Sequence, residues 1–230
     1  MKRCGHLDTT EYKQLHKTRM TPLSLKIDLD LFEKEIDHYK FAFRQWGKGW
    51  RWEKGKNYHR YGAPLVNLNG SMYNNPEPVC YPLNQWNDAN PDNKVKDVMC
   101  TTPTELLSIS SLDPLEELKP YMVRSCILKW HSAGHFKPHT DTKMPSDIIR
   151  LWGANKQVRV RFEKNGEYVR PRDVDVDKKY DWITESVEPG RLYLFDSAIV
   201  HDAGALDDNT YHFFLAFNTN ASELIKNYVR

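Results

Sequence analysis

The sequence has few cysteines. Its 230 residues include four of them, Cys4, Cys80, Cys100 and Cys126, and no two form a C-x-x-C pair. Scattered single cysteines argue against a structural zinc site built from thiolates and against a disulfide framework. We therefore expect reduced thiols and a cytoplasmic protein.

The sequence also lacks a large excess of charge and long hydrophobic runs. A formal net charge of +2 gives no electrostatic reason to expect nucleic acid or an anionic membrane as a partner. No apolar run approaches the length of a membrane-spanning helix, and residues 1–6 contain no apolar segment of a signal peptide. We expect no membrane partner, and nucleic acid is disfavoured.

Apolar and aromatic residues are plentiful, with 40% hydrophobic residues that include 7 Trp, 12 Tyr and 9 Phe. A chain of this length and content can bury one main core. From Tyr121 onward, β-branched and aromatic residues between turn residues predict strands. These strands cover 121–130, 148–152, 157–163, 191–195 and 211–217. Asn165-Gly166, after the alternating third strand, is a hairpin signal.

The part of the chain before Tyr121 has weaker patterns. Residues 1–22 are polar and are predicted to form an extended arm or a mobile end. The other expected elements are a helix over 31–46 with a capping box of Asp30 and Glu33, a strand over 63–68, a long loop over 70–103, a short helix from Asp113 that turns Leu115 and Leu118 inward, and a last helix over 221–229 capped by Asn220.

This order of elements predicts a mainly β (α+β) fold, a cupin-like jelly roll with N-terminal helices packed on it. We expect a single domain over residues 1–230. It divides into an N-terminal helical and loop part over 1–120, a jelly-roll core over 121–218 and a C-terminal helix over 219–230.

Residues 47–61 interleave aromatic and basic side chains. Such a pattern can grip single-stranded nucleic acid by stacking and charge. It can also line the mouth of a pocket for an acidic substrate, or form a solvated loop whose aromatic residues rest on the core. All three interpretations stay open, and substrate contacts are expected in this segment and in the loop over 70–103.

The most informative pattern is His139-Thr140-Asp141, followed much later by His201. Side chains at i and i+2 of a strand share one face, so His139 and Asp141 can reach one metal ion. His201 follows the strand over 191–195, which a jelly roll can place alongside. Two imidazoles and one carboxylate are the ligand set of a mononuclear non-haem iron site. We predict these three residues as catalytic metal ligands.

His131, His135 and His139 also recur at i+4 spacing, which on a helix would make a zinc-binding face. Gly134 and Pro138 argue against a helix there. We therefore expect His135 to have a supporting or structural role.

The segments Gly134–His139, Ile149–Leu151 and Trp182–Asp196, together with His201, resemble the aspartyl/asparaginyl β-hydroxylase family. This family is a branch of the Fe(II)/2-oxoglutarate-dependent oxygenases, and the resemblance covers about residues 121–218. It implies a double-stranded β-helix that holds Fe(II), with 2-oxoglutarate chelating the iron. It also implies hydroxylation of an unactivated C–H bond by dioxygen, with release of succinate and CO2. The implied substrate is an amino acid, or an Asp or Asn side chain of a peptide or protein.

The chain departs from this family at one position. The family places an arginine about ten residues after the second histidine, where it pairs with the far carboxylate of 2-oxoglutarate. Here only His212 stands near that place, and Arg150 matches an arginine of the family's earlier strand. We expect Arg150 and His212 to bind the cosubstrate, with Arg150 alternatively contacting an acidic substrate.

Several neighbouring residues have two possible roles. Arg124, Arg159 and Arg161 could point inward or into solvent, and Trp130, Trp152 and Phe214 could wall the pocket or fill the core. Asp196 could orient His201 or cap its own turn.

Two other functions stay open. One is a metal-dependent cupin-type enzyme that does not use 2-oxoglutarate, which the missing arginine favours. The other is a non-catalytic jelly-roll binding module.

Overall fold

The computed structural model describes residues 6–45, 59–72, 87, 90–132 and 134–230. Trp46, most of the aromatic and basic segment 47–61, and the central part of the loop 70–103 lie outside these residues, so the expectations for them stay predictions.

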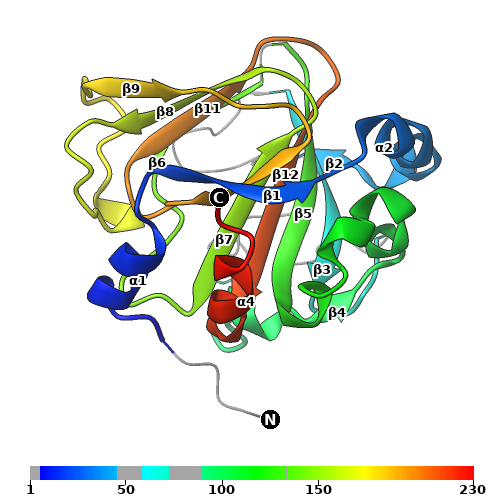
Figure 1. Ribbon diagram of the computed structural model, residues 1–230, viewed down its shortest axis with the longest axis horizontal. Coiled ribbons are helices and arrows are strands. Elements are labelled where there is room, and N and C mark those ends of the chain that lie inside the picture. The colour runs from blue at the N-terminus through cyan, green and yellow to red at the C-terminus, as the bar shows by residue number, and fades with distance from the viewer. Residues whose placement is uncertain (1–5, 46–58, 73–86, 88–89, 133) are drawn as a thin grey trace.

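Two antiparallel sheets make up the body of the molecule (Figure 1). Within the described residues, the larger sheet has eight strands. Seven follow one path: β1 (Met20–Lys26), β10 (Arg191–Phe195), β7 (Ile148–Ala154), β12 (Thr210–Asn218), β5 (Met122–Trp130), β3 (Arg60–Asn67) and β2 (Arg44–Gln45), while β4 (Thr102–Pro103) pairs with β3. The smaller sheet has the order β6 (His135–His139), β11 (His201–Ala205), β8 (Val158–Glu163) and β9 (Trp182–Glu185).

The chain from β5 to β12 passes back and forth between the two sheets. The strands β5, β7, β10 and β12 lie together in the larger sheet, and β6, β8, β9 and β11 form the smaller one. Two sheets wound together in this way form a double-stranded β-helix, the jelly-roll architecture. The predicted mainly β fold class is therefore confirmed.

The larger sheet is apolar on both faces. Trp130, Trp152 and Phe195 lie on the face that packs against Val160 and Phe162 of the smaller sheet. On the other face, Ile127, Leu151 and Phe213 belong to a second core with Phe32 and Ile36 of helix α2 (Leu29–Ile36). Burial on both faces explains why β5, β7, β10 and β12 are almost continuously apolar, which made these four predicted strands recognisable. The fifth predicted strand, β8 of the smaller sheet, was recognisable by its alternation of buried and more exposed residues.

The N-terminal expectations need correction. The described part of the segment 1–22, from residue 6 onward, is neither an extended arm nor a mobile end, because α1 (Thr9–Leu15) begins there with a capping box of Asp8 and Glu11. Strand β1 follows and pairs with β10 at the edge of the larger sheet. Much of β1 alternates between buried and exposed residues, so its polar face concealed a strand in the sequence.

The expected helix over 31–46 is shorter than predicted. Asp28, not Asp30, caps α2 by accepting a hydrogen bond from the Leu31 amide at 3.0 Å. The helix passes into the 3-10 segment η1 (Asp37–Ala42), in which Tyr39 leaves helical geometry with φ −108° and ψ 15°. Apolar residues recur at helical spacing on both sides of this kink, so nothing in the sequence indicated that the helix ends there.

The other predicted helices are also shorter. The segment at Asp113 is the 3-10 turn η4 (Ser110–Leu115), although Leu115 and Leu118 are buried as expected. At the C-terminus, η7 (Thr219–Ala221) leads into α4 (Ser222–Lys226), and Asn218 rather than Asn220 provides the cap. The remaining 3-10 turns are η2 (Asp97–Met99), η3 (Glu105–Ser108), η5 (Lys119–Tyr121) and η6 (Pro171–Asp173).

Three strands of the smaller sheet were not predicted. β6, β9 and β11 are short and contain polar residues, so they lack a clear strand pattern. Asn165-Gly166 forms a turn in which Gly166 has a φ of +66°, but it does not join a tight hairpin because the partner strand β9 begins only at Trp182. None of the helices in the described parts of the chain is long and apolar enough to cross a membrane.

Close packing of β7 against β10 gives a test of the fold. A Cβ atom at Gly153 would lie 2.6 Å from the Arg191 carbonyl oxygen, so Gly153→Ala should lower the free energy of unfolding by about 1–3 kcal/mol. Gly204→Ala on β11 is the control, because its Cβ would meet the flexible end of Arg159 at 3.2 Å. Urea unfolding compares the two variants, and equal losses would contradict the packing described.

Candidate metal centre

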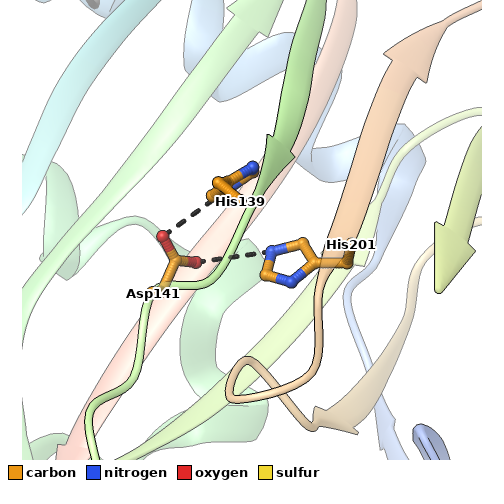
Figure 2. Close-up of side chains that lie close together, drawn as sticks. All are labelled: His139, Asp141 and His201. Carbon is orange, nitrogen blue, oxygen red and sulfur yellow. Dashed lines mark ion pairs between the residues drawn. The ribbon is translucent and has the colours of Figure 1, made fainter. Parts of the chain in front are cut away.

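The three predicted metal ligands lie together at one end of the smaller sheet (Figure 2). His139 is the last residue of β6 and His201 is the first residue of β11. Because β6 and β11 are antiparallel, these two histidines are direct partners across the strand pair. Asp141 follows β6 by two residues and turns its carboxylate toward both rings.

The side chains converge on their metal-binding atoms. Asp141 Oδ1 lies 3.6 Å from His139 Nε2, and Asp141 Oδ2 lies 3.7 Å from His201 Nε2. One ligand atom from each residue lies within 4.8 Å of the others. The three groups could therefore hold one metal ion.

Backbone carbonyls orient both rings. His139 Nδ1 lies 2.7 Å from the Lys137 carbonyl oxygen, and His201 Nδ1 lies 2.8 Å from that of Ile199. A carbonyl oxygen only accepts hydrogen bonds, so each Nδ1 carries the proton. In the neutral ring Nε2 is then the nitrogen that can ligate a metal, and in both histidines it faces Asp141.

Burial and charge favour the protonation states that bind a metal. Burial, followed by the neighbouring His201, lowers the pKa of His139 to about 4. Burial alone would raise the pKa of Asp141, but His139, His201 and Arg150 hold it well below its usual range. At neutral pH the site therefore contains a neutral His139 imidazole and an ionised carboxylate, which suit a divalent cation.

The turn after β10 supports the loop that carries Asp141. The Ser197 carbonyl oxygen accepts hydrogen bonds from the Asp141 amide at 2.9 Å and the Thr142 amide at 3.2 Å. Asp196 accepts from the Ala198 amide and from the Tyr168 hydroxyl, both at 3.2 Å. Of its two possible roles, Asp196 therefore caps its own turn, and His201 is oriented by a carbonyl instead.

His212 lies inside the barrel but is uncharged. Its side chain is fully buried, and its ring stacks on Trp130 at a centroid distance of 4.0 Å. Burial lowers the pKa of His212 to about 3. Neither ring nitrogen of His212 has a hydrogen-bond partner, and neither does Trp130 Nε1. The neutral ring of His212 therefore lies beside the Trp130 indole N–H, and both are buried without a hydrogen-bond partner.

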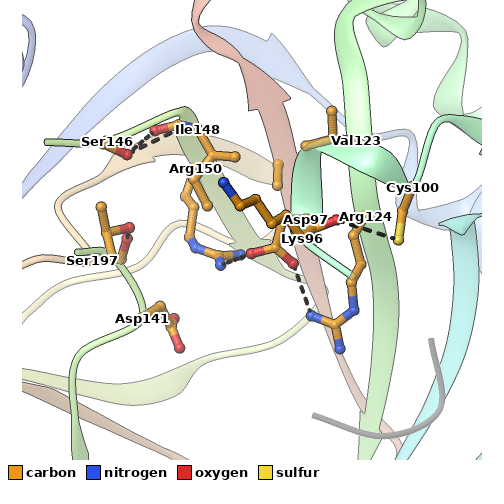
Figure 3. A network of polar contacts seen from close by, with 12 residues as sticks. Lys96, Asp97, Cys100, Val123, Arg124, Asp141, Ser146, Ile148, Arg150 and Ser197 are labelled. Atoms are coloured by element: carbon orange, nitrogen blue, oxygen red, sulfur yellow. Dashed lines mark hydrogen bonds and ion pairs between the residues drawn. The ribbon is translucent and has the colours of Figure 1, made fainter. Parts of the chain in front are cut away.

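Arg150 lies close to the candidate metal ligand Asp141 (Figure 3). Burial alone would lower its pKa, but the charges of Asp141 and Asp97 raise it. Its Nη2 lies 3.5 Å from Asp97 Oδ2, and Arg124 contacts the same carboxylate. Arg150 and Arg124 thus both point inward.

The other candidate residues lie elsewhere. Arg159 is exposed, and Arg161 pairs with Asp202. His135 begins strand β6, so the histidines at i+4 spacing do not form a helical face, in agreement with the expectation. Trp130 and Trp152 are buried in the core between the sheets, and Phe214 packs against it.

Arg60 was not recognised as a site residue from the sequence. It is 1% exposed, pairs with Trp130 across β3 and β5, and donates from Nη1 to the His135 carbonyl oxygen at 2.6 Å. Its guanidinium lies 4.1 Å from the centre of the Phe136 ring. It therefore brings a buried positive charge close to the metal ligands. Its place in a basic segment concealed it, because nothing local distinguishes a buried arginine from the exposed ones.

Comparisons with known proteins give partial similarities. No protein-family model matches the chain, and no curated protein does. The ribosomal oxygenase YcfD from Escherichia coli, solved with cobalt and 2-oxoglutarate, is 25% identical over 49% of this chain, with a TM-score of 0.34. The match spans 28% of the length of YcfD. An oxalate oxidase in complex with the substrate analogue glycolate is 11% identical over 41% of each chain, with a TM-score of 0.28.

The buried carboxyl group of Asp196 generates a pH-dependent prediction. Burial raises its pKa to about 6, so between pH 4 and 6 the folded state holds a proton that the unfolded state has lost. This group therefore stabilises the fold below about pH 4, and that stability is lost as pH rises to 6. Asp196→Asn cannot lose this pH-dependent contribution. The free energy of unfolding of the variant, relative to that of the wild type, should therefore rise by about 2 kcal/mol between pH 4 and pH 7.

Urea unfolding of the metal-free protein at the two pH values measures this difference. The control is Asp177→Asn, because Asp177 is exposed. If Asp196→Asn and the wild type differ by the same amount at both pH values, Asp196 is ionised throughout and the prediction is wrong.

Proposed function

We propose that this protein is an Fe(II)- and 2-oxoglutarate-dependent dioxygenase. It hydroxylates an unactivated C–H bond of an amino-acid or peptidyl substrate of Asp or Asn type, releasing succinate and CO2. The supporting observation is the convergence of His139 Nε2, His201 Nε2 and the Asp141 carboxylate at the end of a jelly-roll barrel. Membership of the aspartyl/asparaginyl β-hydroxylase branch is part of this proposal.

The residues of the chain have separate tasks in this reaction. His139, Asp141 and His201 would hold the metal ion through two imidazole nitrogens and one carboxylate, a ligand set that suits iron. When bound, iron and 2-oxoglutarate supply the activation of dioxygen. Phe136, at a centroid distance of 5.2 Å from His139, and Phe195, at 4.9 Å from His201, shield the rings from water.

Of the two residues expected to bind the cosubstrate, His212 fits the far carboxylate of 2-oxoglutarate better. His212 and Trp130 offer two unsatisfied donors side by side within the barrel. A bound carboxylate would satisfy both donors and raise the pKa of His212. Arg60, which pairs with Trp130 in the sheet, adds positive charge in place of the missing family arginine.

The first test is an anaerobic titration of the Fe(II)-loaded protein with 2-oxoglutarate, which should develop a visible metal-to-ligand charge-transfer band. His139→Ala and His201→Ala should each weaken Fe(II) binding more than about 100-fold and abolish the band. His131→Ala is the control, since its side chain is 40% exposed and contacts Asp208 instead. A band that survives in both ligand variants would disprove the assigned metal site.

The same titration tests the cosubstrate pocket. His212→Phe keeps an aromatic ring against Trp130 but removes the ring nitrogens, so the affinity for 2-oxoglutarate should fall about tenfold while Fe(II) binding is retained. Arg150→Gln should leave 2-oxoglutarate affinity within about twofold. If 2-oxoglutarate affinity instead falls in Arg150→Gln and is unchanged in His212→Phe, Arg150 rather than His212 binds the far carboxylate of 2-oxoglutarate.

A second candidate function follows from the neutral state of His212. If its ring nitrogens do not bind a carboxylate, the protein fits a metal-dependent cupin-type enzyme that does not use 2-oxoglutarate. Iron binding without the charge-transfer band, and without succinate formation, would favour this function. Absence of metal binding would instead favour the non-catalytic binding module.

A further inference from the structure

The N-terminal segment 7–16, which contains helix α1, lies against the loop that carries Asp141. We call residues 140–147, between β6 and β7, the Asp141 loop. The Leu7 amide donates to the Ser146 carbonyl oxygen at 2.8 Å, and the Ser146 amide donates to that of Leu7 at 3.0 Å. Ser146 itself is 1% exposed. Two buried backbone hydrogen bonds therefore join the N-terminal segment to the loop, close to the start of β7.

Tyr12, on the buried face of α1, packs against the other end of the loop. Burial raises the pKa of Tyr12 well above its usual value, and the charge of Asp196 raises it further. The side chains of Ser197 and Thr142 lower the pKa of Tyr12, so the phenol lies close to both. Thr142 Oγ1 lies 2.5 Å from Ser197 Oγ, and Thr142 directly follows Asp141 in the sequence. Tyr12 thus supports the loop next to the metal ligand.

A second contact of Tyr12 leads to the residue before Asp141. The rings of Tyr12 and Tyr168 are nearly perpendicular, with a centroid distance of 5.9 Å and an interplanar angle of 86°. Val169, the next residue, accepts a hydrogen bond from the Thr140 hydroxyl at its carbonyl oxygen, at 3.1 Å. The contacts of α1 therefore reach the Asp141 loop on both sides of the ligand.

Helix α1 has only seven residues, too few to be stable alone in water. At its start, the Asp8 carboxylate accepts hydrogen bonds from the amides of Thr10 at 2.7 Å and Glu11 at 2.9 Å. At its end, the His16 ring stacks on Tyr12 at a centroid distance of 4.0 Å. The helix therefore depends on the same tertiary contacts that reach the loop, and opening of α1 releases the loop.

Asp141 needs such support more than the two histidine ligands do. The rings of His139 and His201 are each fixed by a carbonyl oxygen two residues earlier in their own segment. Asp141 lies two residues beyond β6, and its side chain is 26% exposed, compared with 11% for His139 and 3% for His201. The conformation of the loop therefore decides where the carboxylate lies relative to the two imidazoles.

We propose that the N-terminal segment 7–16 positions Asp141 for metal binding, with Tyr12 as the positioning residue. This inference rests on the metal site of the proposed function and not on its cosubstrate. Because coupling between two sites is reciprocal, a bound metal should stabilise α1 to the extent that α1 strengthens metal binding. A helix that only covers the core would show neither effect.

The first test is hydrogen exchange of the whole chain with and without Co(II), a divalent probe that is stable in air. The amides of Tyr12 and His16 each donate to the carbonyl oxygen four residues earlier at 2.9 Å, so their exchange reports opening of α1. At a Co(II) concentration about 100 times the Kd, their exchange should slow by roughly 100-fold. The Phe32 amide reports opening of α2 through the same kind of bond, and it should slow at least about tenfold less.

Variants separate positioning from general stability. Tyr12→Ala should weaken Co(II) binding at least about tenfold in isothermal titration and change the visible absorption bands of bound Co(II), because the loop loses its support. Tyr12→Phe keeps the ring, and the hydroxyl that it removes has no partner of normal hydrogen-bond geometry among the described residues. The Co(II) affinity of Tyr12→Phe should therefore stay within about twofold of the wild type.

Phe32→Ala is the matched control. It also truncates a fully buried aromatic residue of an N-terminal helix, but Phe32 belongs to the core on the other face of the larger sheet. It should lower the free energy of unfolding while leaving the Co(II) affinity and the absorption bands unchanged. Should Tyr12→Ala fail to fold, the exchange comparison in the wild type decides.

The inference is overturned if Co(II) slows exchange equally in α1 and α2, or if Tyr12→Ala binds Co(II) as tightly as Phe32→Ala. A normal charge-transfer band without coupling to α1 would refute this inference alone. Coupling to α1 without the band would refute the cosubstrate assignment alone. A wild type that binds no Co(II) would refute the metal site and this inference together.

Discussion

The antiparallel pairing of β6 with β11 is the constraint on which the rest of the site depends. It sets His139 directly opposite His201, and the carbonyls of Lys137 and Ile199 then fix both rings by the same local hydrogen bond. Asp141 needs only a short turn to complete the group. The turn after β10 holds that loop through the Ser197 carbonyl oxygen, so backbone hydrogen bonds of the barrel position all three side chains.

The interior of the barrel combines a well-packed aromatic core with polar groups that lack partners. Trp130, Trp152, Phe162 and Phe195 fill the space between the sheets, and burial of these rings supplies much of the stability. Unsatisfied polar atoms of His212, Trp130 and Arg150 lie in the same interior. Buried donors without acceptors cost free energy, which is why the proposed function assigns a bound carboxylate to His212 and Trp130.

Whether a strand or a site residue could be predicted from the sequence depended on how the tertiary structure buries it. The central strands β5, β7, β10 and β12 of the larger sheet were recognisable because both faces are apolar, whereas β6 and β11 were not, because their short runs carry polar residues. The kink at Tyr39 and the edge strand β1 were missed for a similar reason, since local spacing does not record tertiary pairing. Arg60 has an ordinary local sequence, and only its place opposite Trp130 gives it a role.

The sequence by itself determined the jelly-roll class and the identity of the three candidate ligands, because strand patterns and a His-x-Asp spacing are local properties. The tertiary structure alone decided which cations face the interior. Arg124, Arg150, Arg159 and Arg161 all lie on strands, yet the first two are buried against Asp97, whereas Arg159 is exposed and Arg161 pairs with Asp202. The face of a strand that is buried depends on the sheet packed against it, and that partner comes from distant parts of the chain.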